Sequence, residues 1–325
     1  MFHRLFFDVV SGAKMNRVVS AVVALVAACA ALAAQAPPPA APQAEGPTKP
    51  SYRAAVDVIT VTVSVTDAQG RLVTGLTKDD FLVYDDSVEQ PITQFVGERV
   101  PVSLGIVLDV SDSMSGKRMD DARGALDQFV GEQLSQDDEA FLMVFNHKPR
   151  MVSSWTSVPS KLRNALDGVI PMGGTAVYDA IGESLDKFRT RRHQRAAIVL
   201  ISDGADTASD RDLRTLRSSL RRTDAFVYAV AIDPPDVKRI NIKVDVAALN
   251  AITTDSGGYT EVVHDTTELP GATKRIAEEL NQQYLIGYLA PHSADGEYHS
   301  IRVKTKHDGY RVRSRRGYVA ERDRR

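Results

Sequence analysis

The sequence predicts an α/β fold, in which a doubly wound, mostly parallel sheet flanked by helices is inserted in a small antiparallel β-sandwich. Two observations predict it. In the middle of the chain, short apolar runs rich in β-branched residues alternate with segments whose apolar residues recur at helical spacing, as in a parallel sheet covered on both faces. On both sides of this stretch, apolar and polar residues alternate with a period of two, which is typical of antiparallel strands.

The composition is that of a folded protein with a sizeable core. Of the 325 residues, 43% are hydrophobic and 25% are charged, and 40 Lys and Arg nearly balance 42 Asp and Glu. Because the net charge is close to zero, the chain as a whole has no electrostatic attraction to nucleic acid or to an anionic membrane. We therefore expect no nucleic-acid partner, and membrane attachment only through a lipid anchor.

The first 50 residues have the composition of an export signal followed by a linker. An arginine precedes an apolar run from Val18 to Leu32, which is followed by the small residues Ala34-Gln35-Ala36. This run is shorter than the roughly 20 residues that span a membrane. We expect a signal peptide over 1–36, with Met15 as an alternative start, and a Pro- and Ala-rich linker over 37–50.

Cys29, the only cysteine, lies inside this apolar run in the context Val-Ala-Ala-Cys, which resembles a bacterial lipoprotein signal. Two routes of processing stay open. Lipoprotein processing would leave a lipid on Cys29 and tether the mature protein to the envelope, whereas cleavage after Ala36 would leave no cysteine and no disulfide. Either route predicts an exported protein that is periplasmic, secreted or envelope-tethered, and excludes a catalytic cysteine.

The first β region is expected over 51–100. From Val56 to Val65, β-branched and polar residues alternate, and the sequence Asp67–Gly70 supplies a turn. A second alternation covers Asp80–Tyr84, and a third short strand is expected over Pro91–Val96.

The α/β domain is expected over 101–283. Its strands are predicted at four apolar runs, Ser103–Val110, Ala140–Phe145, Ala196–Ile201 and Ala225–Ile232. Its helices are predicted where apolar residues recur at helical spacing, at Met119–Leu134, Ala176–Arg189, Asp212–Leu220, Val246–Thr253 and Leu269–Gln283.

The last region, 284–325, returns to β character in Tyr284–Tyr288, Tyr298–Thr305 and Tyr310–Arg313. Neither this region nor 51–100 has enough strands for a stable core of its own, so we expect the two to combine into one sandwich around the inserted domain. The arginines near the C-terminus are interpreted as the exposed face of an edge strand, where charge discourages aggregation. They include Arg311, Arg313, Arg315 and Arg316.

Oxygen-bearing side chains follow two of the predicted parallel strands. Asp109, Ser111 and Ser113 come directly after the first strand, and Asp203 follows Ala196–Ile201 in the sequence Ser-Asp-Gly. Thr175, preceded by two glycines, leads into a helix. Because ligands bind at the carboxyl edge of such sheets, these side chains are expected to meet there. Carboxylate and hydroxyl oxygens suit Mg²⁺, Mn²⁺ or Ca²⁺ and are poor ligands for zinc or copper.

The pattern Asp-x-Ser-x-Ser, followed by Gly-Gly-Thr and by a strand that ends in Ser-Asp-Gly, resembles the von Willebrand factor type A (VWFA) domain with its metal-ion-dependent adhesion site. The resemblance covers roughly 101–283. The flanking sequences Asp79–Asp85, Gln283–Tyr288 and Arg315–Tyr318 resemble the bacterial, acidobacterial-type VWFA-related family.

The resemblance implies roles for the five site residues. Ser111 and Ser113 would coordinate a cation directly, Thr175 directly or through water, and Asp109 and Asp203 mainly through water. It also implies that an acidic side chain of a protein partner completes the coordination shell. We therefore expect an exported, non-enzymatic binding or adhesion module with a divalent cation, Mg²⁺ first and Mn²⁺ or Ca²⁺ as alternatives.

Two other functions stay open. The first is a metal-assisted hydrolase in which His147, in the loop after Ala140–Phe145, acts as general base. The second is a scaffold for the β-sandwich in which the metal is structural. A phosphohydrolase is not favoured because Ser111 stands where its motif has a second Asp, and the sequence has no phosphate-binding glycine loop.

Overall fold

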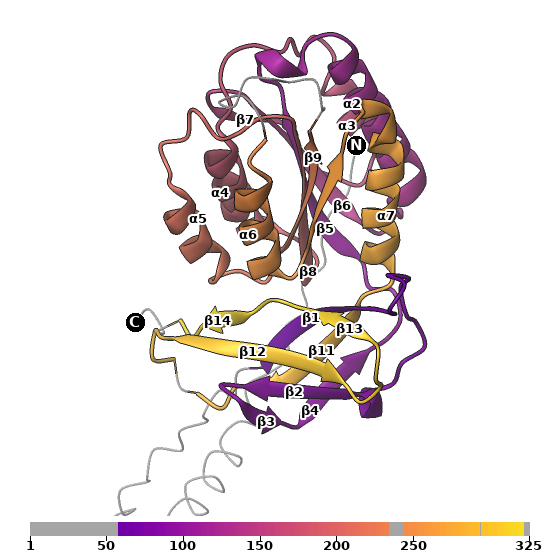
Figure 1. Ribbon diagram of the computed structural model, residues 1–325, viewed down its shortest axis with the longest axis vertical. Helices are drawn as coiled ribbons and strands as arrows, with labels where there is room; N and C mark the ends of the chain where they lie inside the picture. The colour runs from indigo at the N-terminus through magenta and orange to yellow at the C-terminus, as the bar shows by residue number, and fades with distance from the viewer. Residues whose placement is uncertain (1–57, 234–243, 293, 322–325) are drawn as a thin grey trace, which may run out of the picture. The chain divides into compact units, whose positions relative to one another are not determined.

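The computed structural model describes residues 58–233, 244–292 and 294–321, which all belong to one compact unit of the chain. The predicted signal peptide, linker and Cys29 lie outside the described residues. Within them, six strands form the α/β sheet in the order β10-β9-β8-β5-β6-β7, and eight strands form two further sheets of four (Figure 1).

The central strands of the α/β sheet are buried along their whole length. β5 (Val102–Asp109) pairs in parallel with β6 (Glu139–Phe145) and with β8 (Arg195–Ser202), and β8 pairs in parallel with β9 (Phe226–Ile232). Such strands read as continuous apolar runs because both faces of the sheet are covered. The edge strands are the parallel β10 (Thr260–Val263) and the antiparallel β7 (Pro149–Thr156).

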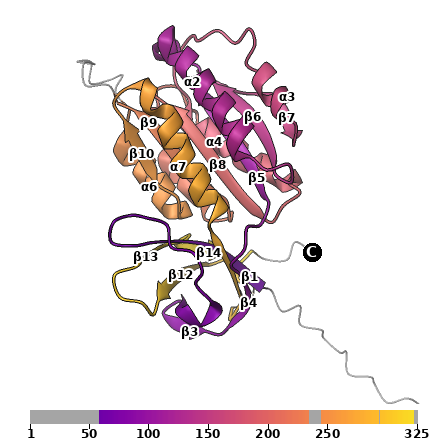
Figure 2. The same cartoon turned by 90° about the vertical axis from the view of Figure 1, so that its right-hand side faces the viewer.

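Helices cover both faces of this sheet (Figures 1 and 2). On one face lie α2 (Lys117–Gln128), α3 (Pro159–Asn164) and α7 (Leu269–Asn281), which share one hydrophobic core with alternate strand residues. On the other face lie α4 (Val177–Lys187), α5 (Leu213–Leu220) and α6 (Val246–Ser256), around a second core. Among the described residues, no helix combines the length and the apolar character that crossing a membrane requires.

The other two sheets each combine strands from both ends of the chain. One has the order β13-β1-β11-β4 and the other β14-β12-β2-β3, and all pairings are antiparallel. One hydrophobic core contains residues of both sheets. The predicted sandwich of N- and C-terminal segments is therefore confirmed. The N-terminal strands are β1 (Val58–Thr66), β2 (Phe81–Asp85), β3 (Val88–Gln90) and β4 (Ile92–Val96). The C-terminal strands are β11 (Tyr284–Leu289), β12 (Tyr298–Thr305), β13 (Arg311–Arg313) and β14 (Gly317–Val319).

Several short elements are absent from the sequence prediction, namely β3, β7, β10, β14 and α3. They lie at sheet edges or in connections, where a strand is short or only half-buried and its apolar pattern is weak. The predicted helix Met119–Leu134 is also not a single α-helix. After Gln128 it continues as a π-helix over Phe129–Gln133, in which backbone hydrogen bonds span five residues instead of four.

The interpretation of the C-terminal arginines as an exposed face is wrong for two of them. Arg313 is half-buried, donates to the carboxylate of Glu279 and lies over the ring of Tyr259 at 4.7 Å. Arg315 is also half-buried and donates to the carbonyl oxygen of Thr60 at 2.9 Å. A buried carboxylate such as Glu279 needs a cationic partner, and β13 supplies it. Arg311 and Arg316 are exposed, as expected.

Candidate metal centre

The five predicted site residues lie in loops that follow or adjoin the two central strands. Asp109 is the last residue of β5, and a 3₁₀ turn over Asp112–Met114 follows it. Asp203 comes directly after β8, the parallel neighbour of β5. Thr175 leads into α4. The carboxyl ends of parallel strands share one edge of the sheet, so the fold brings these loops to the same place.

Backbone hydrogen bonds fix the loop before Thr175 against the loop after β5. The N–H of Asp112 donates to the carbonyl of Gly173 at 3.0 Å, and the N–H of Met172 donates to the carbonyl of Val110 at 2.9 Å. Gly173 has a φ of +81°, a conformation that glycine adopts without strain. The two loops therefore hold each other in place.

Thr175 is positioned from the opposite side by the segment after β8. Its N–H donates to the hydroxyl of Thr207 at 3.0 Å, and its carbonyl accepts the N–H of Thr207 at 2.8 Å. A Cβ on Gly204 would lie 3.1 Å from the Thr175 hydroxyl, which is closer than such contacts normally are. Glycine at position 204 thus lets Thr175 lie next to the backbone that carries Asp203.

A chain of hydrogen bonds connects the first and last of these residues. Asp109 is fully buried, and its two oxygens accept from the Ser111 N–H at 2.8 Å and the Ser202 hydroxyl at 2.5 Å. The hydroxyls of Ser111 and Ser113 are 3.0 Å apart, and that of Ser113 donates to Asp203 at 2.6 Å. Four of the five predicted side chains, together with Ser202, are therefore joined at one edge of the sheet.

Burial raises the pKa of the Asp109 carboxyl group to about 7. The hydrogen bonds from Ser202 and Ser111 oppose this increase, and the negative charge of Asp203 adds to it. A divalent cation would act in the opposite direction, because a nearby positive charge favours the ionised carboxylate.

The structure brings all five predicted residues together, and their role as metal ligands stays a prediction. It also shows two neighbours that are not among the five predicted ligands. Ser202 holds Asp109, and Arg118 donates to the second oxygen of Asp203 at 2.5 Å and to the carbonyl of Ser113 at 3.0 Å. Ser202 stands beside Asp203 in the sequence, which is a usable signal. For Arg118, on α2, the sequence offers none.

His147, the residue of the alternative hydrolase hypothesis, lies at the rim of this site. It is exposed, and its Nδ1 is 3.2 Å from the position that a Cβ on Gly173 would occupy. The hydrogen bonds of Asp109 and Asp203 in the described residues go to serines and Arg118.

The fold and the motif define a class of protein. Residues 104–205 match the family model described as the von Willebrand factor type A domain, so the chain contains a VWFA domain. Among solved structures, it is similar to the von Willebrand factor type A from Catenulispora acidiphila, with a TM-score of 0.50 and 12% identity. That match covers 82% of this chain and 75% of the other, and at this identity it concerns the fold alone.

Two curated proteins are similar to parts of the sequence. Inter-alpha-trypsin inhibitor heavy chain H4 of Homo sapiens is 24% identical over 181 residues, which cover 52% of this chain and 19% of that protein. An uncharacterised protein of Synechocystis sp., sll0103, is 26% identical over 117 residues, covering 35% of this chain and 28% of that protein. The matched part is thus less than a third of either relative.

Proposed function

We propose that this chain is an exported, non-enzymatic protein-binding module, in which a divalent cation bridges the site on the α/β sheet to an Asp or Glu carboxylate of a protein partner. The residues that would hold the cation are Asp109, Ser111, Ser113, Thr175 and Asp203. The observation that carries this proposal is the hydrogen-bonded chain from buried Asp109 through the two serine hydroxyls to Asp203.

The donor set fits a hard divalent cation. It consists of two carboxylates and three hydroxyls, and two carboxylates neutralise one divalent charge. Asp109 is buried, and a bound cation would compensate the charge of its ionised form. We propose Mg²⁺ as the cation, with Mn²⁺ or Ca²⁺ as alternatives. When bound, it would offer an open coordination position to an oxygen ligand.

The surroundings of the site favour a protein partner. Ile170 and Met172 lie in the loop that leads to Thr175, and they are 73% and 57% exposed. Large apolar side chains this exposed are expected where another protein packs. A carboxylate on the cation and apolar contacts beside it would together form an interface with a polar centre and an apolar flank.

Metal binding is tested by isothermal titration with Mg²⁺ and Mn²⁺. Wild type is expected to bind one cation at this site, and the variant Asp109→Ala/Asp203→Ala is expected to lose it. The control Asp120→Ala/Asp127→Ala removes two carboxylates that are 75% and 58% exposed on α2. Equal binding by wild type and the first variant would refute the site.

Partner binding is tested by capture of envelope or secreted proteins with and without EDTA. Capture that requires the cation and is weakened by Ile170→Ser/Met172→Ser supports the bridging role. Capture that persists in EDTA supports the scaffold hypothesis instead. Turnover on an ester and phosphoester panel that disappears in His147→Ala would support the hydrolase.

Export and its route are tested on the mature protein. Mass determination of its N-terminus distinguishes a lipid on Cys29 from cleavage after Ala36. Retention of the unprocessed chain in the cytoplasm would contradict export.

A further inference from the structure

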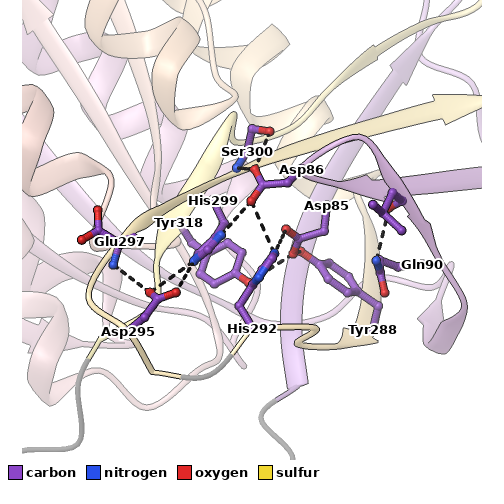
Figure 3. A network of polar contacts seen from close by, with 11 residues as sticks. Asp85, Asp86, Gln90, Tyr288, His292, Asp295, Glu297, His299, Ser300 and Tyr318 are labelled. Atoms are coloured by element: carbon purple, nitrogen blue, oxygen red, sulfur yellow. Dashed lines mark hydrogen bonds and ion pairs between the residues drawn. The ribbon is translucent and has the colours of Figure 1, made fainter.

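A cluster of two aspartates and two histidines, which are common metal ligands, lies in the β-sandwich (Figure 3). Asp85 ends β2, Asp86 follows in the turn to β3, His292 comes after β11, and His299 belongs to β12. One ligand atom from each residue lies within 4.8 Å of the other three. Nitrogen and oxygen atoms from distant parts of the chain thus converge on one point.

We propose that Asp85, Asp86, His292 and His299 bind a zinc ion. Zn–N and Zn–O bonds of about 2.0–2.2 Å in a tetrahedral arrangement place neighbouring ligand atoms roughly 3.3 Å apart. His299 Nδ1 is 2.8 Å from Asp86 Oδ2, and His292 Nε2 is 3.2 Å from Asp85 Oδ1 and 3.4 Å from Asp86 Oδ2. Two imidazoles favour zinc over the Mg²⁺ proposed for the α/β sheet.

Both carboxylates are held so that one oxygen remains directed at the histidines (Figure 3). Asp85 Oδ2 accepts hydrogen bonds from the hydroxyls of Tyr288 at 2.7 Å and Tyr318 at 3.1 Å, which leaves Oδ1 beside His292. Asp86 Oδ1 accepts from the N–H and the hydroxyl of Ser300 at 2.8 and 3.0 Å. Its Oδ2 lies between the two imidazoles. Outer partners of this kind orient the ligands of metal sites.

His299 has the same kind of outer partner. Its Nε2 lies 3.2 Å from a carboxylate oxygen of Asp295, and its Nδ1 lies on the side of the cluster, 2.8 Å from Asp86 Oδ2. A carboxylate behind a histidine is a recurring support of zinc-binding imidazoles.

One divalent cation balances the charges of the cluster. The rings of His292 and His299 are stacked, with their centroids 3.8 Å apart and an angle of 11° between the planes, so binding one ion through both rings requires one of them to turn out of the stack. One zinc ion neutralises both carboxylates and leaves both imidazoles neutral. Asp85 and His299 are 1% and 6% exposed, so an uncompensated charge on either would be costly.

The cluster joins segments that are far apart in the sequence. Asp85 and His292 are separated by 207 positions, with Asp85 at the end of β2 and His292 in the segment between β11 and β12. A zinc ion here would connect the turn between β2 and β3 to the segment between β11 and β12. Its four protein ligands make it a structural site.

The test uses the full chain with Asp109→Ala/Asp203→Ala, so that no cation at the α/β site is counted and failure of the first proposal does not affect the second. After metal removal by EDTA and dialysis, Zn²⁺ is titrated and the metal content measured. We expect one zinc per chain with a dissociation constant below about 1 µM. Replacing zinc by Co²⁺ is expected to give the visible absorption of a tetrahedral site.

Three further substitutions distinguish the site from surface binding. His292→Ala/His299→Ala is expected to abolish stoichiometric binding, and Asp295→Asn to weaken it about 10- to 100-fold. His307→Ala is the control, because His307 pairs with Asp80 at 2.8 Å elsewhere in the sandwich, and it is expected to change nothing. If the double variant does not fold, His292→Ala alone, whose side chain is 30% exposed in wild type, replaces it.

Two outcomes would overturn the zinc site. One is the absence of stoichiometric zinc binding, which would leave a hydrogen-bonded His and Asp cluster with a protonated His299. The other is binding that survives loss of the histidines with the same affinity. If Asp109→Ala/Asp203→Ala binds zinc but no longer binds Mg²⁺, the result supports both sites, each independently of the other.

Discussion

Replacing Asp109 by Asn should change how the stability of the metal-free protein depends on pH. The pKa of Asp109 rises from its ordinary value of 3.8 to about 7 because the carboxyl group is buried. Between these values the folded state keeps a proton that the unfolded state has lost, so stability falls as pH rises. At about 1.4 kcal/mol per pKa unit, the total loss by pH 8 is on the order of 4 kcal/mol.

Asn preserves the shape of the side chain and removes the titration. Its carbonyl can accept the Ser111 N–H, and its amide can donate to the Ser202 hydroxyl, which is free to rotate. Two pKa units of this titration lie between pH 5 and pH 7, so the difference in unfolding free energy between variant and wild type is expected to increase by about 2.7 kcal/mol, in favour of the variant, from pH 5 to pH 8.

The assay is urea denaturation in EDTA at pH 5 and pH 8, followed by tryptophan fluorescence. Trp155 is the only tryptophan, and it packs on Phe141 and Phe188 in the α/β domain, so its emission reports this domain. Added Mg²⁺ at about 100 times its dissociation constant should stabilise wild type at pH 8 by about 2.7 kcal/mol and leave the variant unchanged. A pH-dependent difference below about 1 kcal/mol would show that Asp109 ionises normally and refute the reasoning.

Three further substitutions test other parts of the structure. Arg118→Met removes the positive charge beside Asp203 and should tighten Mg²⁺ binding on the order of tenfold. The control is Lys117→Met, which removes a neighbouring charge that pairs with Asp121 and should not change Mg²⁺ binding. Weaker Mg²⁺ binding by Arg118→Met would contradict this prediction. Gly105→Ala places a Cβ 2.6 Å from the buried Phe141 ring and should cost about 1–3 kcal/mol of stability, with Gly124→Ala, which has open space, as control. Glu279→Ala leaves the Tyr228 hydroxyl and Arg313 without their carboxylate partner and should lower the free energy of unfolding, measured by denaturation, by about 3 kcal/mol. A loss under about 1 kcal/mol would show that water replaces the carboxylate.

The fold is predictable where both faces of an element are covered. β5, β6, β8 and β9 are buried throughout, so their sequences are unbroken apolar runs and their predicted bounds differ little from the observed ones. β7 is half-exposed and β10 has four residues, and neither has a pattern that distinguishes it from a loop. The burial of Arg313 depends on the tertiary position of Glu279, which local sequence does not contain.

The two candidate sites differ in the same way. The positions of the five residues of the first site could be predicted because they lie at the end of a strand or in a loop before a helix, and parallel strands end at one edge. Their role as metal ligands stays a prediction. The grouping of Asp85 and Asp86 with His292 and His299 depends on the pairing of β2 with β12. These residues are far apart in the sequence and form no local motif that would indicate this pairing. Their proximity is therefore seen only in the folded structure.

Because the sandwich combines both ends of the chain, its N-terminal strands are synthesised well before the C-terminal strands with which they pair. Ser64 on β1 bonds to Glu279, 215 positions later, and β1 pairs with β11 beyond that point. At roughly 5–20 residues per second, β1 waits about 10–40 s for its partner strand to be made. During that time its nine residues, rich in valine and threonine, present an unpaired edge on which a second nascent chain could pair. The yield of native protein therefore depends on how β1 is protected while the inserted domain is made, as well as on the stability of the finished fold.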